Sequence, residues 1–240
     1  MGEARLAGVQ AQDCQCRPDG DCQFADICPR DATRVCRPKG TSIALPGIKP
    51  TRVYLVHEGV VGMFRAWPSG EETIISLWTP GSLFGALSLL EERELPRPAL
   101  FPGHLRTLTP SCICELNPES FLSHICSDPQ AARVVVTLLV KELRQTYRIS
   151  MLPARRGAER ALAWVLALLA EKAGERNDKG WLISSYFTHQ DLADMARLTR
   201  ATATRALHKL HGDGLIDFRG KQIVVLSIDR LWALVEDDRQ

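Results

Sequence analysis

Two short helices joined by a tight turn are encoded in the carboxyl-terminal part of the chain. Thr188-His-Gln-Asp191 has the form of a capping box, in which the threonine hydroxyl accepts from a backbone amide and the acid bonds back. Thr199 is placed to cap a second helix, after a turn at Ala196-Arg-Leu198. Apolar residues recur at helical spacing after each cap, at Leu192, Met195, Ala196, Ala203, Ala206, Leu207 and Leu210. This pattern predicts a helix-turn-helix.

The second of these helices has a polar, basic outer face, and a hairpin follows it. Residues 215–218 and 222–226 are strand-forming and flank Arg219-Gly-Lys221, which predicts a wing with a basic tip. A winged helix-turn-helix brings its second helix to base edges, while hydroxyls and cations hold phosphates. The expected DNA contacts are Thr188, Thr199, Arg200, Thr202, Thr204, Arg205, Lys209 and Lys221. A helical domain with a solvated basic face is the alternative, but the caps and the wing together favour DNA binding.

Short apolar segments separated by glycine and proline fill residues 41–127. Val60–Trp67 and Glu72–Trp78 predict two strands joined by a turn, and residues 105–109 and 112–116 predict two more. Many short strands with such turns are typical of an antiparallel β-barrel or jelly roll. Combined with the helices that follow, this predicts an α+β fold.

Residues 128–153 follow a helical pattern instead. One apolar stripe is formed by Val136, Val140, Leu143 and Tyr147, and further apolar residues widen it. A helix that is apolar on more than one side can pack on its own domain and on a second copy of itself, as in a coiled-coil dimer. The alternative is a helix buried within a monomer. Another helix is expected over residues 158–173, followed by a polar loop at 174–180.

Eight cysteines are clustered along the chain, at Cys14, Cys16, Cys22, Cys28 and Cys36 and again at Cys112, Cys114 and Cys126. No apolar run is long enough for a membrane span or a secretory signal, so we expect a cytoplasmic protein without membrane association. In a reducing compartment, such clustering favours metal or redox chemistry over structural disulfides.

Four regions are therefore expected: a cysteine-rich cofactor-binding segment (1–40), a β-barrel sensor domain (41–127), a dimerisation helix (128–153) and a winged-helix DNA-binding domain (154–240). The formal net charge is only +2, so DNA must be bound by a local basic patch. No catalytic pattern stands out, and we expect no enzyme. An iron–sulfur electron-transfer protein is the alternative of a different class, but it leaves the winged helix unexplained.

The order of these parts resembles the CRP/FNR family of transcription regulators. Thr188–Leu207 resembles the family's carboxyl-terminal signature, while Glu58-Gly59 and Pro80–Gly85 look like the glycine turns of its barrel. The resemblance covers roughly residues 50–230. It implies a homodimer on a palindromic operator, with RNA polymerase as a partner.

The resemblance also assigns roles on the second helix. By position, Arg200 and Arg205 match base-reading residues of the family. Ala201 stands where family members commonly have a glutamate that accepts from cytosine N4, and alanine offers no acceptor. The usual half-site sequence of the family is therefore not expected here.

Three kinds of switch belong to this fold by resemblance: a cyclic nucleotide, a haem and an iron–sulfur cluster. The nucleotide cassette needs Gly-Glu and Arg-Ser where this chain has Gly85-Ala86 and Arg97-Pro98, and proline lacks both the hydroxyl and the amide donor. A haem would need axial ligands, for which His57 or a cysteine could serve, but nothing in the sequence fixes a pair.

Two matches favour the cluster. Cys22-Gln-Phe-Ala-Asp-Ile-Cys28 resembles the amino-terminal ligand loop of FNR-type members, and Cys114 lies on a segment that resembles the strand carrying their distant fourth ligand. Thiolates suit such clusters. The expected cofactor is a 4Fe–4S cluster that responds to oxygen or nitric oxide, held by four of Cys14, Cys16, Cys22, Cys28 and Cys114.

The ligand set stays open, because Asp19 stands where FNR-type loops have a further cysteine. Either Cys16 or Cys14 replaces it, or a different frame uses Cys14, Cys16 and Cys22 and omits Cys28. A structural zinc site and a thiol–disulfide switch are the competing interpretations. Cys112, two residues from Cys114 on a strand, is an alternative ligand, and Cys126 is expected to be buried in packing.

Overall fold

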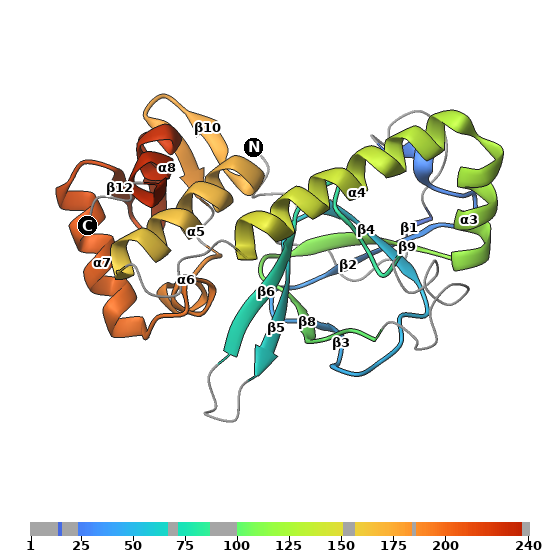
Figure 1. Ribbon diagram of the computed structural model, residues 1–240, viewed down its shortest axis with the longest axis horizontal. Coiled ribbons are helices and arrows are strands. Elements are labelled where there is room, and N and C mark those ends of the chain that lie inside the picture. Colours follow the sequence, from blue (N-terminus) through green and yellow to red (C-terminus); the bar gives the residue numbers. More distant parts are fainter. Residues whose placement is uncertain are drawn as a thin grey trace. The chain divides into compact units, whose positions relative to one another are not determined.

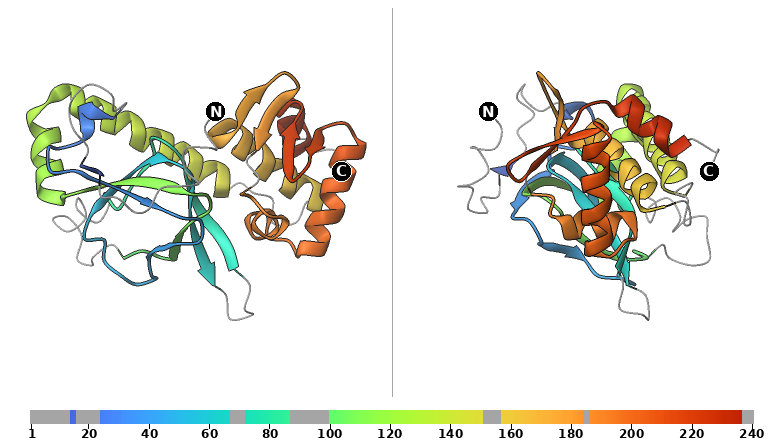
Figure 2. Two further views of the ribbon diagram at one scale, coloured as in Figure 1. Left: turned by 180° about the vertical axis from the view of Figure 1, so that it is seen from behind. Right: turned by 90° about the vertical axis from the view of Figure 1, so that its left-hand side faces the viewer.

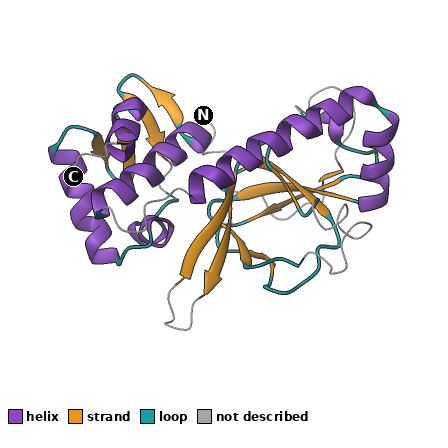
Figure 3. Ribbon diagram, viewed as in Figure 1, coloured by secondary structure: helices purple, strands orange, loops and turns teal. Residues whose placement is uncertain are grey.

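Figure 1 shows the computed structural model of the chain, which describes residues 14–15, 24–66, 72–86, 100–150, 157–183 and 186–236. The chain divides into two compact units. The first comprises Met1–Arg65 and Ile75–Arg148, and the second comprises Ala66–Ile74 and Ile149–Gln240. Strands and helices are both abundant (Figure 3), which confirms the α+β fold class.

Two antiparallel sheets make up most of the first unit. One has the strand order β1-β2-β9-β4-β7, with bounds Cys14–Gln15, Thr33–Arg37, Ser111–Leu116, Val53–Glu58 and Leu83–Phe84. The other has the order β3-β8-β5-β6, with bounds Ser42–Ala44, His104–Thr107, Val61–Ala66 and Glu72–Trp78. The four strands predicted from the sequence correspond to β5, β6, β8 and β9, so the antiparallel β domain is confirmed.

Alternate residues of these strands pack into two different hydrophobic cores, because successive side chains of a strand point to opposite faces of the sheet. Ile113 of β9 lies between the sheets in a cluster with residues of β4, β5, β6 and β8. Its neighbours Cys114 and Leu116 belong to a second cluster, which we call the outer core. Both faces of β9 are therefore covered, and almost every residue of the strand is buried.

Two helices and a short 3-10 turn cover the outer core. They are η1 (Ala25–Ile27), α3 (Pro118–Ser127) and α4 (Pro129–Ser150). Both views in Figure 2 show α4 running alongside the first of the two sheets. The Asn117 side chain accepts from the backbone amides of Glu119 (2.9 Å) and Ser120 (3.2 Å), which starts α3 directly after β9. This cap turns the chain from the sheet onto its outer face.

Two tight turns of the sheets require glycine. Gly59, between β4 and β5, has φ = 83°, and a Cβ there would lie 2.3 Å from the carbonyl oxygen of Pro110. Gly85, after β7, has φ = 79°, and a Cβ would lie 2.7 Å from the carbonyl oxygen of Arg52. Both positions belong to the glycine turns noted in the sequence, and their geometry explains why side chains are excluded.

The second unit is built around a buried helix. α5 (Ala158–Ala173) packs against α6 (His189–Ala196), α7 (Arg200–Gly212) and α8 (Ile228–Glu236). Beside it lies a sheet of order β10-β11-β13-β12, with bounds Glu175–Asn177, Gly180–Ile183, Gln222–Val225 and Ile216–Arg219.

The prediction of a polar loop at residues 174–180 is wrong in one respect, because this segment contains strand β10. The Asn177 side chain accepts from the backbone amides of Lys179 (2.9 Å) and Gly180 (2.9 Å). These bonds close a tight turn, so that β10 pairs with β11 although its side chains are polar.

Candidate DNA-binding surface and cysteine site

The helix-turn-helix begins with the predicted capping box. The Thr188 hydroxyl accepts from the amide of Asp191 (3.1 Å), and the Asp191 carboxylate accepts from the amide of Thr188 (2.8 Å). The hydroxyl also donates to that carboxylate (2.7 Å). The Thr188 side chain, expected to contact DNA, is therefore already bonded within its own helix end.

The second helix, α7, also starts at the predicted residue. The Thr199 hydroxyl accepts from the Thr202 amide (3.2 Å) and donates to the Thr202 hydroxyl (2.9 Å). The apolar residues predicted to face inward from α6 and α7 are all buried: Leu192, Met195, Ala196, Ala203, Ala206, Leu207 and Leu210. The helix-turn-helix prediction is confirmed at the level of secondary structure, capping and burial.

The outer face of α7 presents its cations to solvent. Arg200 and Arg205 are exposed, and a guanidinium nitrogen of Arg205 donates to the Thr202 hydroxyl (3.4 Å). The Thr204 hydroxyl lies 3.2 Å from Nδ1 of His189, and Lys209 pairs with Glu159 of α5 (3.6 Å). The predicted contacts on α7 thus form one polar face, and Lys209 would have to leave Glu159 to reach a phosphate.

The wing is present as predicted. β12 and β13 pair antiparallel down to Arg219 and Gln222, and Gly220 (φ = 62°) and exposed Lys221 form the tip. This places Lys221 on a different element from the other predicted contacts.

Sequence reasoning missed the contacts that hold the wing to α7. The ring of Phe218 lies 5.9 Å from that of His208 and 5.2 Å from that of His211. Asp217 pairs with His211 (3.5 Å) and Lys179 (3.5 Å). The backbone amide of Phe218, and then the Lys179 ammonium, lower the pKa of the Asp217 carboxyl. No local sequence signal marks these contacts, because they join separate elements.

The stripe predicted for dimerisation lies on the exposed side of α4. Val136, Val140, Leu143 and Tyr147 are between 46% and 59% exposed. Val135 is buried instead, and Val134, Leu138 and Leu139 pack against the outer core. The helix therefore uses one side for its own domain and presents four large apolar residues on another.

Two of the candidate metal ligands are associated with the outer core. Cys114 is fully buried there, and Cys28, directly after η1, packs against the same cluster. In the backbone, Cys14 of β1 pairs with Arg34 of β2, which pairs in turn with Cys114. Cys16 and Cys22 lie outside the described residues. Within the part of the chain that is described, no group of three or more His, Cys, Asp or Glu side chains is arranged for a metal.

The other cysteines correct two expectations. Cys112, the alternative ligand, forms a disulfide with Cys36, because the antiparallel register of β2 and β9 places these residues directly opposite each other. The preference for metal or redox chemistry over disulfides is therefore wrong for this pair. Cys126 is exposed on α3 and not buried in packing.

His57, considered as a haem ligand, lies beside Arg34 on the first sheet. Its Nε2 is 3.3 Å from an Arg34 guanidinium nitrogen, and the Phe24 ring meets the imidazole edge-on at 5.9 Å. Burial, and then the Arg34 charge, lower the pKa of His57, while Glu58 acts in the opposite direction. The imidazole is consequently favoured in its neutral form.

Comparisons with known proteins agree with this geometry. Residues 34–128 match the cyclic nucleotide-binding domain family, and residues 159–234 match the Crp-like helix-turn-helix domain family. The chain is 30% identical to a global nitrogen regulator of Synechococcus elongatus over 79% of this chain and 83% of that protein. The chain belongs to the CRP family of transcription regulators.

Other relatives support this assignment. A cyclic AMP receptor protein of Thermus thermophilus is 29% identical over 75% of this chain and 77% of that protein. A solved structure of a CRP-family transcriptional regulator from the same organism shares the fold, with a TM-score of 0.67, 19% identity, and coverage of 86% of this chain and 98% of that one. CRP-family regulators bind DNA and act as dimers. This chain is thus a DNA-binding transcription regulator, and not an enzyme.

The nucleotide cassette of this CRP-family chain departs from the expected residues. Ala86 follows Gly85 at the position where the cassette needs glutamate, and its methyl group is buried. Arg97 and Pro98 lie outside the described residues. Among the described helices, none combines the length and apolar character of a membrane span.

Proposed function

We propose that this CRP-family regulator binds a palindromic operator as a homodimer, acts together with RNA polymerase, and is controlled by a 4Fe–4S cluster held by four of Cys14, Cys16, Cys22, Cys28 and Cys114. The observation that carries the cofactor proposal is the shared position of Cys28 and Cys114 in the outer core. These thiols come from sequence positions far apart, as expected for a ligand loop closed by one remote strand residue. The buried, apolar surroundings also suit a thiolate-ligated cluster.

The chain's own residues would connect such a site to dimerisation. When bound, the cluster supplies a redox centre that oxygen or nitric oxide can attack. Ligation by Cys114 and Cys28 would tie the segment around η1 to β9. The outer core that contains Cys114 also contains Val135 of α4, and Leu138 and Leu139 pack against it. A change at Cys114 would therefore be passed to the dimerisation helix through the packed side chains of the outer core.

The test is the absorption spectrum of anaerobically purified protein, with iron and sulfide counted. We expect the wild-type protein to be brown. In Cys114→Ser we expect the iron and sulfide to be lost, and DNA binding no longer to respond to air. Cys126→Ser is the matched control, because Cys126 is exposed and outside the outer core. A colourless wild-type protein that contains zinc would contradict the cluster and favour a structural zinc site.

A thiol–disulfide switch is the second candidate, and the Cys36–Cys112 disulfide favours it. The bond joins β2 to β9, the strand that also carries Cys114. Oxidation of the two thiols by oxygen would tie these strands covalently, and reduction would release them. Loss of the air response in Cys112→Ser, with the response retained in iron-free wild-type protein, would assign the switch to this disulfide.

A further inference from the structure

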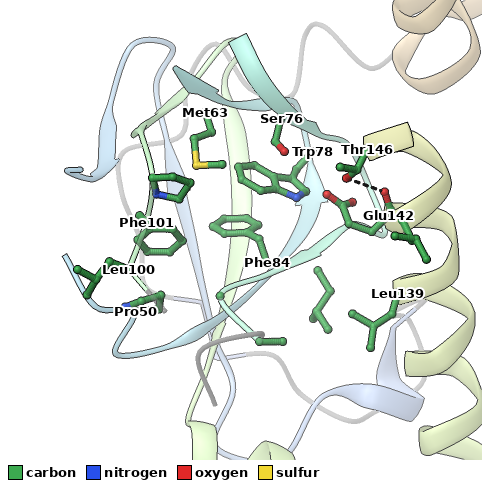
Figure 4. Close-up of a pocket in the computed structure, with 15 residues that line it drawn as sticks. Pro50, Met63, Ser76, Trp78, Phe84, Leu100, Phe101, Leu139, Glu142 and Thr146 are labelled. Atoms are coloured by element: carbon green, nitrogen blue, oxygen red, sulfur yellow. Dashed lines mark hydrogen bonds between the residues drawn. The ribbon is translucent and has the colours of Figure 1, made fainter. Parts of the chain in front are cut away.

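A pocket of about 570 Å³ opens in the first unit between the strands and α4 (Figure 4). This volume lies within the range of small-molecule pockets, about 300–1,000 Å³. Its apolar walls include Met63, Trp78, Phe84, Leu100, Phe101 and Leu139. Two of these residues form a stacked pair, since the rings of Trp78 and Phe84 lie 4.7 Å apart at 27°. Such a wall suits a flat, apolar molecule.

One polar group on this wall is unsatisfied. Trp78 is almost fully buried, and its indole Nε1 has no hydrogen-bond partner among the described residues. A buried donor without an acceptor is costly, and a buried indole N–H usually finds a partner. In Figure 4 the indole nitrogen points toward the side chain of Glu142, which lines the pocket from α4. A ligand oxygen placed between them could accept from Trp78.

The charge on the described part of the pocket's lining is unfavourable for anions. Among the described residues that line it, Glu142 is the one charged side chain, and none is lysine, arginine or histidine. Ala86, also on the wall, offers no carboxylate for a ribose hydroxyl. A phosphate or carboxylate would meet no cationic side chain on the described part of the lining and would lie close to the Glu142 carboxylate, which is unfavourable in an apolar site.

We propose that this pocket binds an uncharged, flat, largely apolar molecule that carries a hydroxyl group. The oxygen of the ligand hydroxyl accepts a hydrogen bond from Nε1 of Trp78, and the same hydroxyl donates a hydrogen bond to the Glu142 carboxylate. The ligand class therefore differs from the cyclic nucleotides for which the matched domain family is named. Leu143 lines the pocket and also belongs to the exposed stripe of α4, so an occupant touches the helix proposed to dimerise.

Calorimetric titration of the full-length protein with four probes tests the proposal. The probes are 2-naphthol, 2-methylnaphthalene, 2-naphthoate and cyclic AMP. We expect 2-naphthol to bind most tightly, about three- to tenfold more tightly than 2-methylnaphthalene, because one buried hydrogen bond is gained. The two anions should bind more weakly than either neutral probe. Stronger binding of cyclic AMP or 2-naphthoate, or no binding of 2-naphthol, would overturn the proposal.

Two variants assign the polar contacts. Trp78→Phe keeps a ring but removes the N–H, so it should abolish the advantage of 2-naphthol while 2-methylnaphthalene still binds. Trp181→Phe, in the second unit, is the matched control and should change neither affinity. Glu142→Gln on α4 removes only the charge and should strengthen 2-naphthoate binding, which provides a readout if Trp78→Phe does not fold. An unchanged preference for 2-naphthol in folded Trp78→Phe, or unchanged rejection of 2-naphthoate in Glu142→Gln, would contradict the geometry.

Discussion

Arg197 adopts the left-handed conformation, with φ = 57°, in the turn between α6 and α7. The turn depends on this geometry, because the amide of Leu198 then donates to the carbonyl of Ala193 (2.9 Å). A side chain with a Cβ is disfavoured in this region. Arg197→Gly should therefore raise the free energy of unfolding by about 0.5–1 kcal/mol, and Arg197→Val should lower it. Urea titration measures both, and equal stability of the two variants would exclude backbone strain at this turn.

His57 should make the stability of the first unit depend on pH. Its pKa is lowered from 6.5 in the folded protein, so the unfolded state binds more protons as the pH falls through that range. The stabilisation is complete above the unfolded pKa and is lost as the pH falls from it toward the lower folded pKa. Wild-type protein should lose more stability between about pH 7.5 and about pH 5.5 than His57→Gln. Denaturant midpoints at the two pH values check this, and parallel losses would show that His57 does not contribute.

At the scale of elements, α4 illustrates which structural features can be predicted from the spacing of residues along the sequence. The helical spacing of Val136, Val140, Leu143 and Tyr147 predicts an apolar stripe, and all four residues are exposed on α4. The capping threonines of α6 and α7 are likewise visible in the sequence, because capping involves residues three apart. Such local signals account for most of the helices and for the wing.

The pairing of Cys36 with Cys112 could not be predicted in the same way. These residues are 76 positions apart, and only the register of β2 against β9 places them opposite each other. The packing of Cys28 against the outer core that contains Cys114 has the same origin, since a packed cluster is set by tertiary contacts. The identity of candidate ligands was therefore accessible from sequence, but their grouping was not.

The exposed stripe of α4 leads to a prediction about association. Val140→Glu should convert a dimer to monomers, raising the dimer dissociation constant at least about 100-fold, because an unpaired charge would be buried in the interface. Val140 does not line the pocket, so ligand binding is not altered directly. Lys141→Glu, which places the same carboxylate at the next exposed position, should leave the dimer intact. Light scattering gives the molar mass, and a dimer that survives Val140→Glu would place the interface elsewhere.

At the scale of the whole molecule, the proposed homodimer on a palindrome would present α7 and the wing once to each half-site. Contacts to bases and contacts to phosphates should then be distinguishable, because base contacts depend on the DNA sequence and phosphate contacts depend on the salt concentration. Arg200 is exposed at the start of α7, where side chains reach base edges, whereas Lys221 is exposed at the wing tip, where it can meet phosphate. Lys209 is a less direct probe of phosphate binding, because it pairs with Glu159.

We therefore expect different consequences from two alanine substitutions. Arg200→Ala should cost about 1–3 kcal/mol per half-site on the selected operator and little on random DNA, because a base contact is lost. Lys221→Ala should weaken both DNAs alike and reduce the magnitude of the salt slope by about 1.8, since two phosphate contacts are lost at about 0.9 each. Fluorescence anisotropy at several salt concentrations measures both effects. If Arg200→Ala weakened specific and random DNA equally, Arg200 would be a phosphate contact, and sequence reading would have to rest on Arg205 and its neighbours on α7.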